Sequence, residues 1–348
     1  MDTVTHALSG ALLAMALAPR AARPGALSRR ARIAAGAAAA AFPDSDFALR
    51  AADTLTYLNL HQGVTHSLIL MPVWAWLLAL LFAQAARPHY RWPAFYGIAV
   101  LGIAIHIGGD VVTAYGTQLL APFSGTRFSW PLLFLIDPYV TAILVAGLVL
   151  GGVWPQRRLA SLAFVALAAY LGLTLILLQR AIAVGDDFAR NHQLQGAVSH
   201  ALPQPLSPFH WLILVEHGEG YRLARVNLAR NPNDHRGEAS GFLVRMADGY
   251  TSVAGAAWSY YSRFGTNPAE MMLARNIFEH MAFAPFRRFA RFLVLDHVES
   301  RASGSCVWFS DLRFSLPELP PSFRYGLCRS SGQTEWRLAR LPGAFGID

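Results

Sequence analysis

Long apolar runs dominate the first half of the chain, and shorter runs follow in the second half. The apolar segments lie at about 5–18, 31–42, 67–86, 93–113, 132–153 and 159–179. The last four approach or exceed the roughly 20 residues that cross a bilayer, whereas the first two are short and rich in Ala and Gly. The pattern predicts a membrane helical bundle of about six apolar helices, the first two being incomplete spans or helices packed inside the bundle.

After residue 200 the pattern changes to short runs that are typical of strands. Residues 209–228 predict a hairpin that turns at Gly218–Gly220, and two further antiparallel pairs are predicted over 291–316 and 323–341. Asn267 and Pro268 predict a helix start, with the helix continuing to about Phe283. We therefore expect a helical metal-site domain at 1–182, a Pro-punctuated connector at 183–209 and a small α+β extramembrane domain at 210–348.

The composition agrees with an integral membrane protein. Hydrophobic residues make up 54% of the chain, charged residues make up 14%, and the mean hydropathy is +0.34. All 29 basic residues are Arg, so a P-loop lysine and a Schiff-base lysine are excluded. The N-terminus carries Asp2 and no Arg before the first apolar run, which does not fit a signal peptide.

The arginines predict the topology. If all six segments span, the loops of one side hold Arg20, Arg23, Arg29, Arg30, Arg32, Arg87, Arg91, Arg157 and Arg158. By the positive-inside rule this side is cytoplasmic. The N-terminus, the acidic residues of the membrane half and everything after residue 180 then face outward. We therefore expect a multi-pass protein of the bacterial inner membrane with a periplasmic C-terminal domain.

Several titratable residues lie at the ends of the apolar segments. Such groups cost several kcal/mol at membrane depth unless they are paired or coordinated, so they suggest a functional site. The residues that we interpret as metal ligands are His6, Asp44, His66, His106 and Asp110. His106 and Asp110 are one helical turn apart and can reach the same ion. The alternatives are a His hydrogen-bonded within the bundle and an Asx-type turn at Pro43.

Two five-residue segments are almost identical, VTHAL at 4–8 and VTHSL at 64–68. In each, the Thr is placed to cap a helix and the His to occupy its first turn. Asp46, His61 and Asp137 are the candidate catalytic residues. His61 is alternatively a further ligand or a partner of one, and Asp137 is alternatively an ordinary helix-entry residue before Pro138.

The ligand types predict a divalent metal, one or two ions. Nitrogen and oxygen donors suit Zn²⁺ and leave Mn²⁺ or Fe²⁺ possible. The first Glu of the chain is Glu216, so an acid or base from the membrane half would have to be an Asp or a water molecule activated by the metal. The seven histidines from His192 to His297 lack ligand spacing, and surface or core roles are expected for them.

The order of these motifs resembles the YdjM-like family, described as LexA-binding, inner-membrane-associated and predicted to be metal-dependent hydrolases. The matching elements are Thr5–Leu8, Pro43–Asp46, His61–Ser67, His106–Asp110, Tyr115–Thr117 and Asp137–Pro138. The resemblance covers about residues 1–180 and implies a metal-dependent hydrolase. Gln62 departs from the family pattern, in which an Arg is expected, so a role for a cation there is in doubt. The LexA association is hard to reconcile with an outward-facing soluble domain.

A more distant likeness concerns the order of ligands alone. A His near the N-terminus, an Asp, another His and then a His-x-x-x-Asp helix is similar to the zinc-dependent phospholipase C and S1/P1 nuclease group. That likeness implies cleavage of phosphodiesters. Several ligands of the group, including a Glu, have no counterpart in this sequence.

Two functions from different classes follow. The first is a hydrolase that cleaves an ester or a phosphodiester at the periplasmic face, with a lipid-like substrate inferred from location. The second is a non-catalytic protein that a metal stabilises and whose C-terminal domain binds a partner. A transporter is a weaker third option, because no inverted repeat of span length is detectable. The lipid bilayer is the expected partner, no nucleic acid is expected, and a protein partner cannot be named.

Cys306 and Cys328 are predicted to form a disulfide, because both fall in strand-like segments of the domain placed in the oxidising periplasm. The alternative is two buried free thiols that act as small apolar residues.

Overall fold

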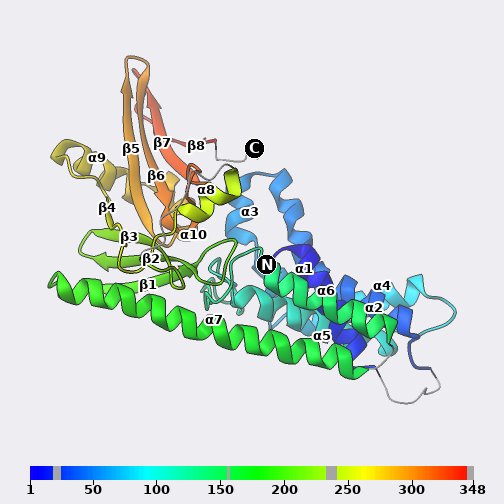
Figure 1. Cartoon of the computed structure of the whole chain (residues 1–348). Coiled ribbons are helices and arrows are strands. Elements are labelled where there is room, and N and C mark those ends of the chain that lie inside the picture. Colours follow the sequence, from blue (N-terminus) through cyan, green and yellow to red (C-terminus); the bar gives the residue numbers. More distant parts are fainter. Residues whose placement is uncertain (19–24, 155–156, 233–240, 343–348) are drawn as a thin grey trace. The chain divides into compact units, whose positions relative to one another are not determined.

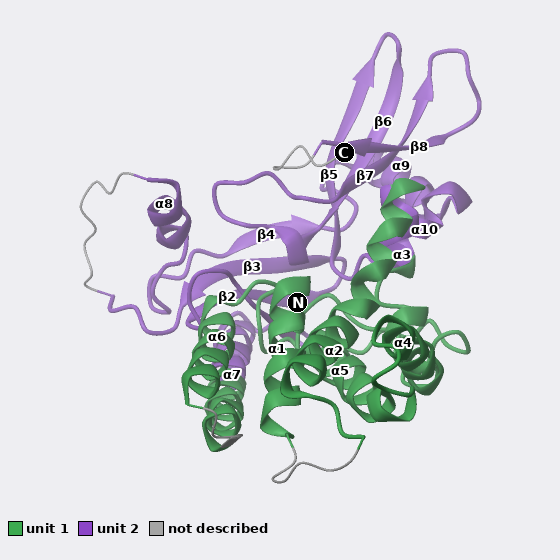
Figure 2. Cartoon of the chain, turned by 90° about the vertical axis from the view of Figure 1, so that its right-hand side faces the viewer, with its two compact units in different colours: residues 1–53, 60–176 green, residues 54–59, 177–348 purple. Residues whose placement is uncertain are grey.

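The computed structural model describes residues 1–18, 25–154, 157–232 and 241–342. These residues form two compact units, each described here by itself (Figure 2). Unit 1 consists of residues 1–53 and 60–176, and unit 2 consists of residues 54–59 and 177–348. The division therefore falls inside one long helix, which continues past residue 182 into the segment predicted to be a connector.

Unit 1 is helical, and its α-helices are labelled in Figure 1. It contains α1 (Thr3–Ala16), α2 (Arg29–Ala41), η1 (Phe42–Ala51), η2 (Val64–His66), α4 (Met71–Ala85), α5 (Pro93–Val111), α6 (Pro138–Val153) and the first part of α7 (Arg157–Asn191). Helix α1 packs against α2, α5 and α6, and α5 also packs against α2 and α4. This arrangement puts α5 in the middle of the bundle, where its His and Asp side chains are surrounded by protein.

Small residues allow the helices to approach closely. A Cβ atom at Gly36 of α2 would lie 2.5 Å from the carbonyl oxygen of Gly10 on α1, and one at Gly102 of α5 would lie 2.7 Å from the Cβ atom of Ala39. Because only glycine fits at such distances, the backbones of α1, α2 and α5 are in direct contact. The completely buried Ala39, Ala99 and Ile103 fill the space between them.

The expectation of about six apolar spanning helices is not supported. Among the described residues, α5 and α7 are long and apolar enough to cross a membrane. A pair of segments, Thr54–His66 and Met71–Ala85, bent by 80° at their junction, is a third candidate. Helices α1 and α6 are apolar but have only 14 and 16 residues.

The overestimate has local causes that hydropathy does not detect. Pro138 stands at the start of α6, so residues 132–137 of the predicted segment lie outside the helix. Pro72 likewise stands at the start of α4 and shortens the segment 67–86. Proline fits the first turn of a helix but not its interior, so an apolar run that contains Pro is longer than its helix.

Unit 2 contains two antiparallel sheets of four strands (Figure 1). The first has β1 (Val198–Pro203), β2 (His210–His217), β3 (Gly220–Asn227) and β4 (Ser259–Ser262), and the second has β5 (Leu293–Arg301), β6 (Gly304–Asp311), β7 (Arg324–Ser330) and β8 (Arg337–Leu341). In both sheets the strands neighbour one another in chain order. The predicted hairpins β2–β3, β5–β6 and β7–β8 are confirmed. Strands β1 and β4 were not predicted, and β1 lies in the predicted connector.

Apart from the last part of α7, the helices of unit 2 are short. They are α3 (Thr54–Leu60), α8 (Phe242–Asp248), α9 (Pro268–Glu279) and α10 (Ala284–Phe289), with 3₁₀ turns η3 (Met281–Phe283) and η4 (Leu312–Phe314). Asn267 caps α9 as predicted, accepting from the amide of Ala269. The Arg-rich segment 286–291 begins inside α10. Pro285 starts this helix, and Phe286 and Phe289 are buried one turn apart.

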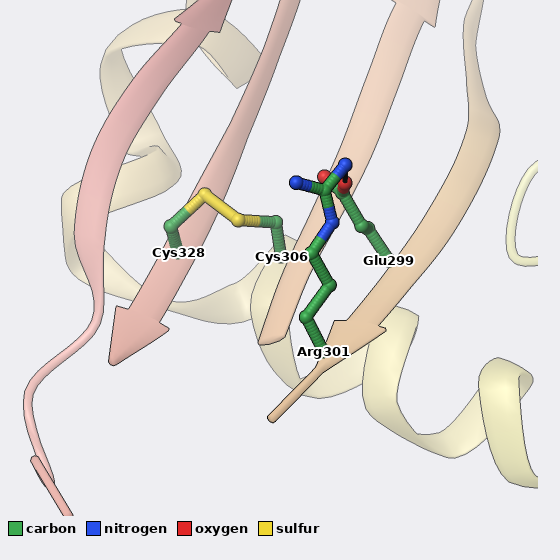
Figure 3. The surroundings of a disulfide bond; sticks show 4 residues. All are labelled: Glu299, Arg301, Cys306 and Cys328. Atoms are coloured by element: carbon green, nitrogen blue, oxygen red, sulfur yellow. Dashed lines mark ion pairs between the residues drawn. A yellow bond between two sulfur atoms is a disulfide. The ribbon is translucent and has the colours of Figure 1, made fainter. Parts of the chain in front are cut away.

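The predicted disulfide is confirmed. Cys306 on β6 and Cys328 on β7 lie directly opposite each other in the antiparallel register and are bonded (Figure 3). On the neighbouring strand β5, Glu299 and Arg301 form an ion pair. A bond that closes a loop of this size stabilises a fold by about 3 kcal/mol, mainly by restricting the unfolded chain. The two cysteines therefore join the central strands of the second sheet covalently.

Candidate metal centre

Four side chains that are distant in sequence converge in unit 1. Asp44 comes from η1, His66 from η2, and His106 and Asp110 from α5. One ligand atom from each lies within 4.8 Å of the corresponding atom of every other residue in the group. The side chains of the last three are fully buried, and that of Asp44 is 11% exposed. These four residues are called the metal cluster below.

The helical period of α5 aligns two members of the cluster. His106 and Asp110 are four residues apart, and the Nε2 atom of His106 lies 3.2 Å from Oδ2 of Asp110. The other ring nitrogen of His106, Nδ1, donates to the carbonyl oxygen of Ala40 at 2.6 Å. A carbonyl can only accept, so Nδ1 carries a proton, and Nε2 is the ring nitrogen that faces the cluster and can present a lone pair to a metal.

The same reasoning shows which ring nitrogen of His66 carries a proton. Its Nδ1 atom lies 2.9 Å from Oγ1 of Thr65, and this hydroxyl donates its own proton to Oδ2 of Asp46 at 3.0 Å. Nδ1 of His66 is therefore the donor, and its Nε2 atom presents a lone pair. That atom lies 2.9 Å from Nε2 of His106 and 3.1 Å from Oδ2 of Asp110.

The centre of the cluster thus contains only acceptor atoms. Two imidazole lone pairs face Oδ2 of Asp110, which is buried and accepts no hydrogen bond, and Oδ1 of Asp44. Burying acceptors without a donor is unfavourable, and a divalent cation is the partner that all four atoms can share. The residues therefore fit a metal. Their nitrogen and oxygen donors suit Zn²⁺, Mn²⁺ and Fe²⁺.

His6, the fifth predicted ligand, lies beside the cluster. Its Nε2 atom is 3.1 Å from Oδ1 of Asp110, and its ring stacks on that of His106 with 3.6 Å between the centroids. The amino group of Met1 also contacts Oδ1 of Asp110. Asp110 therefore divides its two oxygens between the cluster and the start of α1.

The two similar segments at 4–8 and 64–68, called the THxL segments below, do not start helices in the way that was predicted. Asp2 caps α1 by accepting from the amide of Thr5, so Thr5 is not the cap. Thr65 and His66 lie in the 3₁₀ turn η2, before α4 begins at Met71. The sequence match therefore reflects a shared placement of His near the site and not a shared helix start.

Asp46 and His61 form a pair next to the cluster. Nδ1 of His61 donates to Oδ1 of Asp46 at 2.8 Å, and Oδ2 of Asp46 also accepts from the amide of Gln62 at 3.2 Å. Burial raises the pKa of Asp46, but the hydrogen bond and charge of His61 outweigh it and hold that pKa below its usual value. Through Thr65, the ionised Asp46 also orients His66.

Asp137 has a position at a helix start. Its Oδ1 atom accepts from the amides of Tyr139 and Val140, which makes it the N-cap of α6, and its Oδ2 atom accepts from the hydroxyl of Tyr170 at 2.8 Å. It is not part of the metal cluster. Its catalytic assignment stays a prediction, and the helix-entry alternative describes the contacts that it makes.

Several residues of the site were not predicted from the sequence. Thr3 donates to Oδ2 of Asp44 at 2.6 Å, and the carbonyl of Ala40 holds His106. A backbone carbonyl leaves no signal in a sequence. Gln62, at the position where the family pattern has Arg, is buried and accepts from Thr117 at 3.1 Å. A cation nevertheless lies close by, because Arg127 donates to the carbonyl oxygens of Gly116 and His61.

Comparison with known proteins places these residues in a family. Residues 1–181, more than half of the chain, match the family described as YdjM inner membrane protein. The chain belongs to this family. The matched region contains all eight residues that were predicted as ligands or catalytic groups. The YdjM family assignment therefore confirms the resemblance that the motif order suggested, and the family is one of inner membrane proteins.

One curated protein is similar to part of this chain. The protein named uncharacterized protein YfhP, from Bacillus subtilis (strain 168), is 31% identical over 147 residues, which are 40% of this chain and 43% of that protein. The match therefore spans less than half the length of the relative. No solved structure matches this chain.

Proposed function

We propose that this YdjM family member is a membrane-bound hydrolase that cleaves an ester or a phosphodiester at a metal centre. The observation that carries the proposal is the buried cluster of acceptor atoms beside the pair of Asp46 and His61. When bound, a divalent metal supplies Lewis acidity, which polarises the carbonyl or phosphoryl oxygen and lowers the pKa of water. One or two ions, Zn²⁺ first among them, fit the donors.

The residues have distinct roles in this proposal. Asp44, His66, His106 and Asp110 hold the metal, and His6 either fixes Asp110 or contributes to a second ion. Ala40 and Thr65 hold the imidazole rings so that the Nε2 atoms face the centre. Such partners of ligands commonly change metal affinity 10 to 100-fold, as an order of magnitude.

Proton transfer is assigned to His61. Because its Nδ1 proton is held by Asp46, Nε2 is the ring atom that can take up and release a proton. Its side chain is 13% exposed, whereas that of His66 is fully buried, so His61 is the better placed of the two to exchange a proton with water. A base or acid of this kind contributes roughly 10² to 10⁴-fold to a rate.

The orientation is also part of the proposal. Unit 2 and the outer end of α5 face the periplasm, and the Arg-containing loops face the cytoplasm. Because α5 and α7 both run outward from the cytoplasm in this topology, the 16-residue α6 has to return the chain to the inner side. The pairing of Cys306 with Cys328 supports this placement, because disulfides persist in oxidising compartments. The metal cluster then lies near the periplasmic face, since Asp110 is the second-last residue of α5.

One observation favours the second candidate function. The cluster offers four protein ligands, the number that closes the tetrahedral shell of a structural zinc site. In that case the metal stabilises the bundle, and unit 2 binds a protein partner.

The experiment compares metal content with turnover in the purified, full-length protein. We expect stoichiometric metal and hydrolysis of members of a panel of esters and phosphodiesters. We also expect His61→Gln to keep the metal while its turnover falls about 100-fold or more, in the range of lost acid–base catalysis. A matched change, His192→Gln, alters an exposed histidine directly after α7 and should leave both quantities unchanged. Bound metal with four protein ligands, without any turnover, would establish the structural role instead.

A further inference from the structure

The segment between α5 and α6, residues 112–137, is irregular and displays large apolar side chains. It is called the entry loop below. Phe123 is 80% exposed, Ile136 59% and Trp130 49%, and Leu120 and Leu135 are exposed as well. Phe123 is followed directly by the small and polar residues Ser124, Gly125 and Thr126. An exposed apolar surface next to polar residues in one loop requires an explanation other than core packing.

Hydrogen bonds fix the entry loop to two of the three segments that carry residues of the metal cluster. The amide of Leu68, two residues after His66, donates to the carbonyl of Leu119 at 3.0 Å. The amide of Trp130 donates to the carbonyl of Val111, the residue after Asp110, at 2.7 Å. The backbone that carries the exposed side chains of the loop is therefore bonded to the segments of His66 and Asp110.

The ligand segments themselves carry further exposed apolar side chains. Val4 is 67% exposed, Phe47 54% and Val64 45%, and each lies within three residues of a predicted ligand, namely His6, Asp44 and His66. The segments that supply His6, Asp44 and His66 therefore each have an exposed apolar side chain close to the predicted ligand in sequence.

The bilayer surface is the environment that fits this pattern. The entry loop begins directly after α5, a helix long and apolar enough to cross a membrane, and ends at the apolar helix α6. Irregular backbone is not tolerated where it faces the hydrocarbon core, so the loop belongs at the boundary with the headgroups. Trp, Tyr and other amphipathic side chains are enriched at that boundary.

We propose that the entry loop lies in the bilayer surface and that the substrate of the metal centre is a membrane lipid ester or phosphodiester. This inference rests on the proposed function and names its substrate class. Hydrolysis breaks one C–O or P–O bond of the lipid. The acyl or phosphoryl centre gains the hydroxyl group of water, and the leaving alcohol gains the proton. The acyl chains of the lipid stay in the bilayer, beside the exposed apolar side chains.

The location of the loop is tested with a fluorescent label at Phe123→Cys. The native cysteines are paired, so the introduced thiol is the labelling site. The full-length protein is placed in phosphatidylcholine–phosphatidylglycerol vesicles, and the label is quenched either by a shallow spin-labelled lipid or by aqueous iodide. The control is Ser303→Cys, at the exposed turn between β5 and β6.

We expect the lipid quencher to act at least threefold more strongly at position 123 than at position 303, and iodide to show the opposite order. Iodide quenching at position 123 equal to that at position 303 would overturn the proposal. Quenching by neither reagent would overturn it too, because it would mean that a protein surface covers the loop.

The substrate class is tested by comparing two ester substrates, a phospholipid in vesicles and a water-soluble short-chain ester. Phe123→Ser should lower the ratio of lipid turnover to soluble-ester turnover at least fivefold, with the metal content unchanged. An unchanged ratio would contradict a lipid substrate. If the unaltered protein hydrolyses neither substrate, the proposed function fails, whereas the labelling result still decides where the loop lies.

Discussion

His66 and His106 face each other through their Nε2 atoms at 2.9 Å, and the hydrogen bonds of their Nδ1 atoms leave a lone pair on each facing nitrogen. Without a cation this contact is repulsive, and Asp110 adds a carboxylate to it. A cation that binds both nitrogens and the carboxylate relieves this repulsion, so the metal is expected to contribute to the stability of the fold.

The first prediction concerns metal removal. Chelation should lower the midpoint of thermal unfolding of the full-length protein by several degrees, because the acceptor atoms then lose their shared partner. In His106→Ala the bound metal should be lost, and the chelator should have no further effect. The midpoint is measured in detergent, together with metal content by mass spectrometry. An unchanged midpoint in the native protein after complete removal of the metal would contradict this view of the cluster.

The second prediction uses the two THxL segments as a matched pair. Thr65→Val removes the hydroxyl between Asp46 and His66, and metal affinity should fall roughly 10 to 100-fold, as for other partners of ligands. Thr5→Val removes the equivalent hydroxyl of the first segment, which bonds to Asp2 and Thr141. Its metal affinity should stay within about twofold of the native value. Competition with a fluorescent chelator measures the metal affinity of both variants. Equal losses of affinity would argue against the role of Thr65 in connecting Asp46 to His66.

A third prediction tests the contact between α1 and α2. Gly36→Ala places a methyl group 2.5 Å from the carbonyl of Gly10, and we expect a loss of about 1–3 kcal/mol in the free energy of unfolding. Gly97→Ala is the control, because nothing lies within 4 Å of its added Cβ atom in α5. Denaturant titration in mixed micelles compares the two variants. If Gly36→Ala were as stable as the control, the helices could not be in backbone contact.

The fourth prediction concerns acid stability of unit 2. Burial, followed by the charge of Arg291, lowers the pKa of His200 below 6.5, although Glu216 acts in the opposite direction. The unfolded chain then binds a proton at His200 more readily than the folded chain does. The stabilising contribution is complete above about pH 6.5 and is lost as the pH falls through the lowered pKa.

Replacing His200 with Gln should therefore flatten the fall in unfolding midpoint from pH 7 to pH 5, relative to the native protein and to His192→Gln. Thermal scans of the three proteins at half-unit pH intervals provide the comparison. Parallel curves would show that His200 is not the group responsible.

The fifth prediction is topological. Reporter fusions after Arg30 and Arg157 should report cytoplasm, and a fusion after Ser199 should report periplasm, because the arginines stay on the inner side. A cytoplasmic signal after Ser199 would reverse the orientation and move the metal centre to the other face.

The sequence predicts those features of the fold that depend on local periodicity. His106 and Asp110 could be assigned to one helix face because the helical repeat fixes a spacing of four residues. The hairpin over 209–228 could be located because its turn contains two glycines. The number of spanning helices could not be predicted in the same way, since Pro72 and Pro138 start helices inside runs that are apolar throughout.

The partners of the ligands were the least predictable part of the site. The carbonyl of Ala40 is chemically identical to every other carbonyl of α2, and only the packing of α5 against α2 selects it. Thr5 and Thr65 stand in nearly the same five letters, yet one bonds to Asp2 and the other to Asp46. Tertiary structure, and not the local motif, decides which hydroxyl serves the metal centre.

The carboxylate of Asp110 also has a consequence for the order in which the protein is made. One of its oxygens belongs to the metal cluster and the other bonds to His6, 104 residues earlier in the chain. The first helix is therefore synthesised long before Asp110, and His6 lacks this partner until α5 has been made. The contact that fixes His6 and the candidate metal site both need Asp110, so neither is complete before α5 has been synthesised.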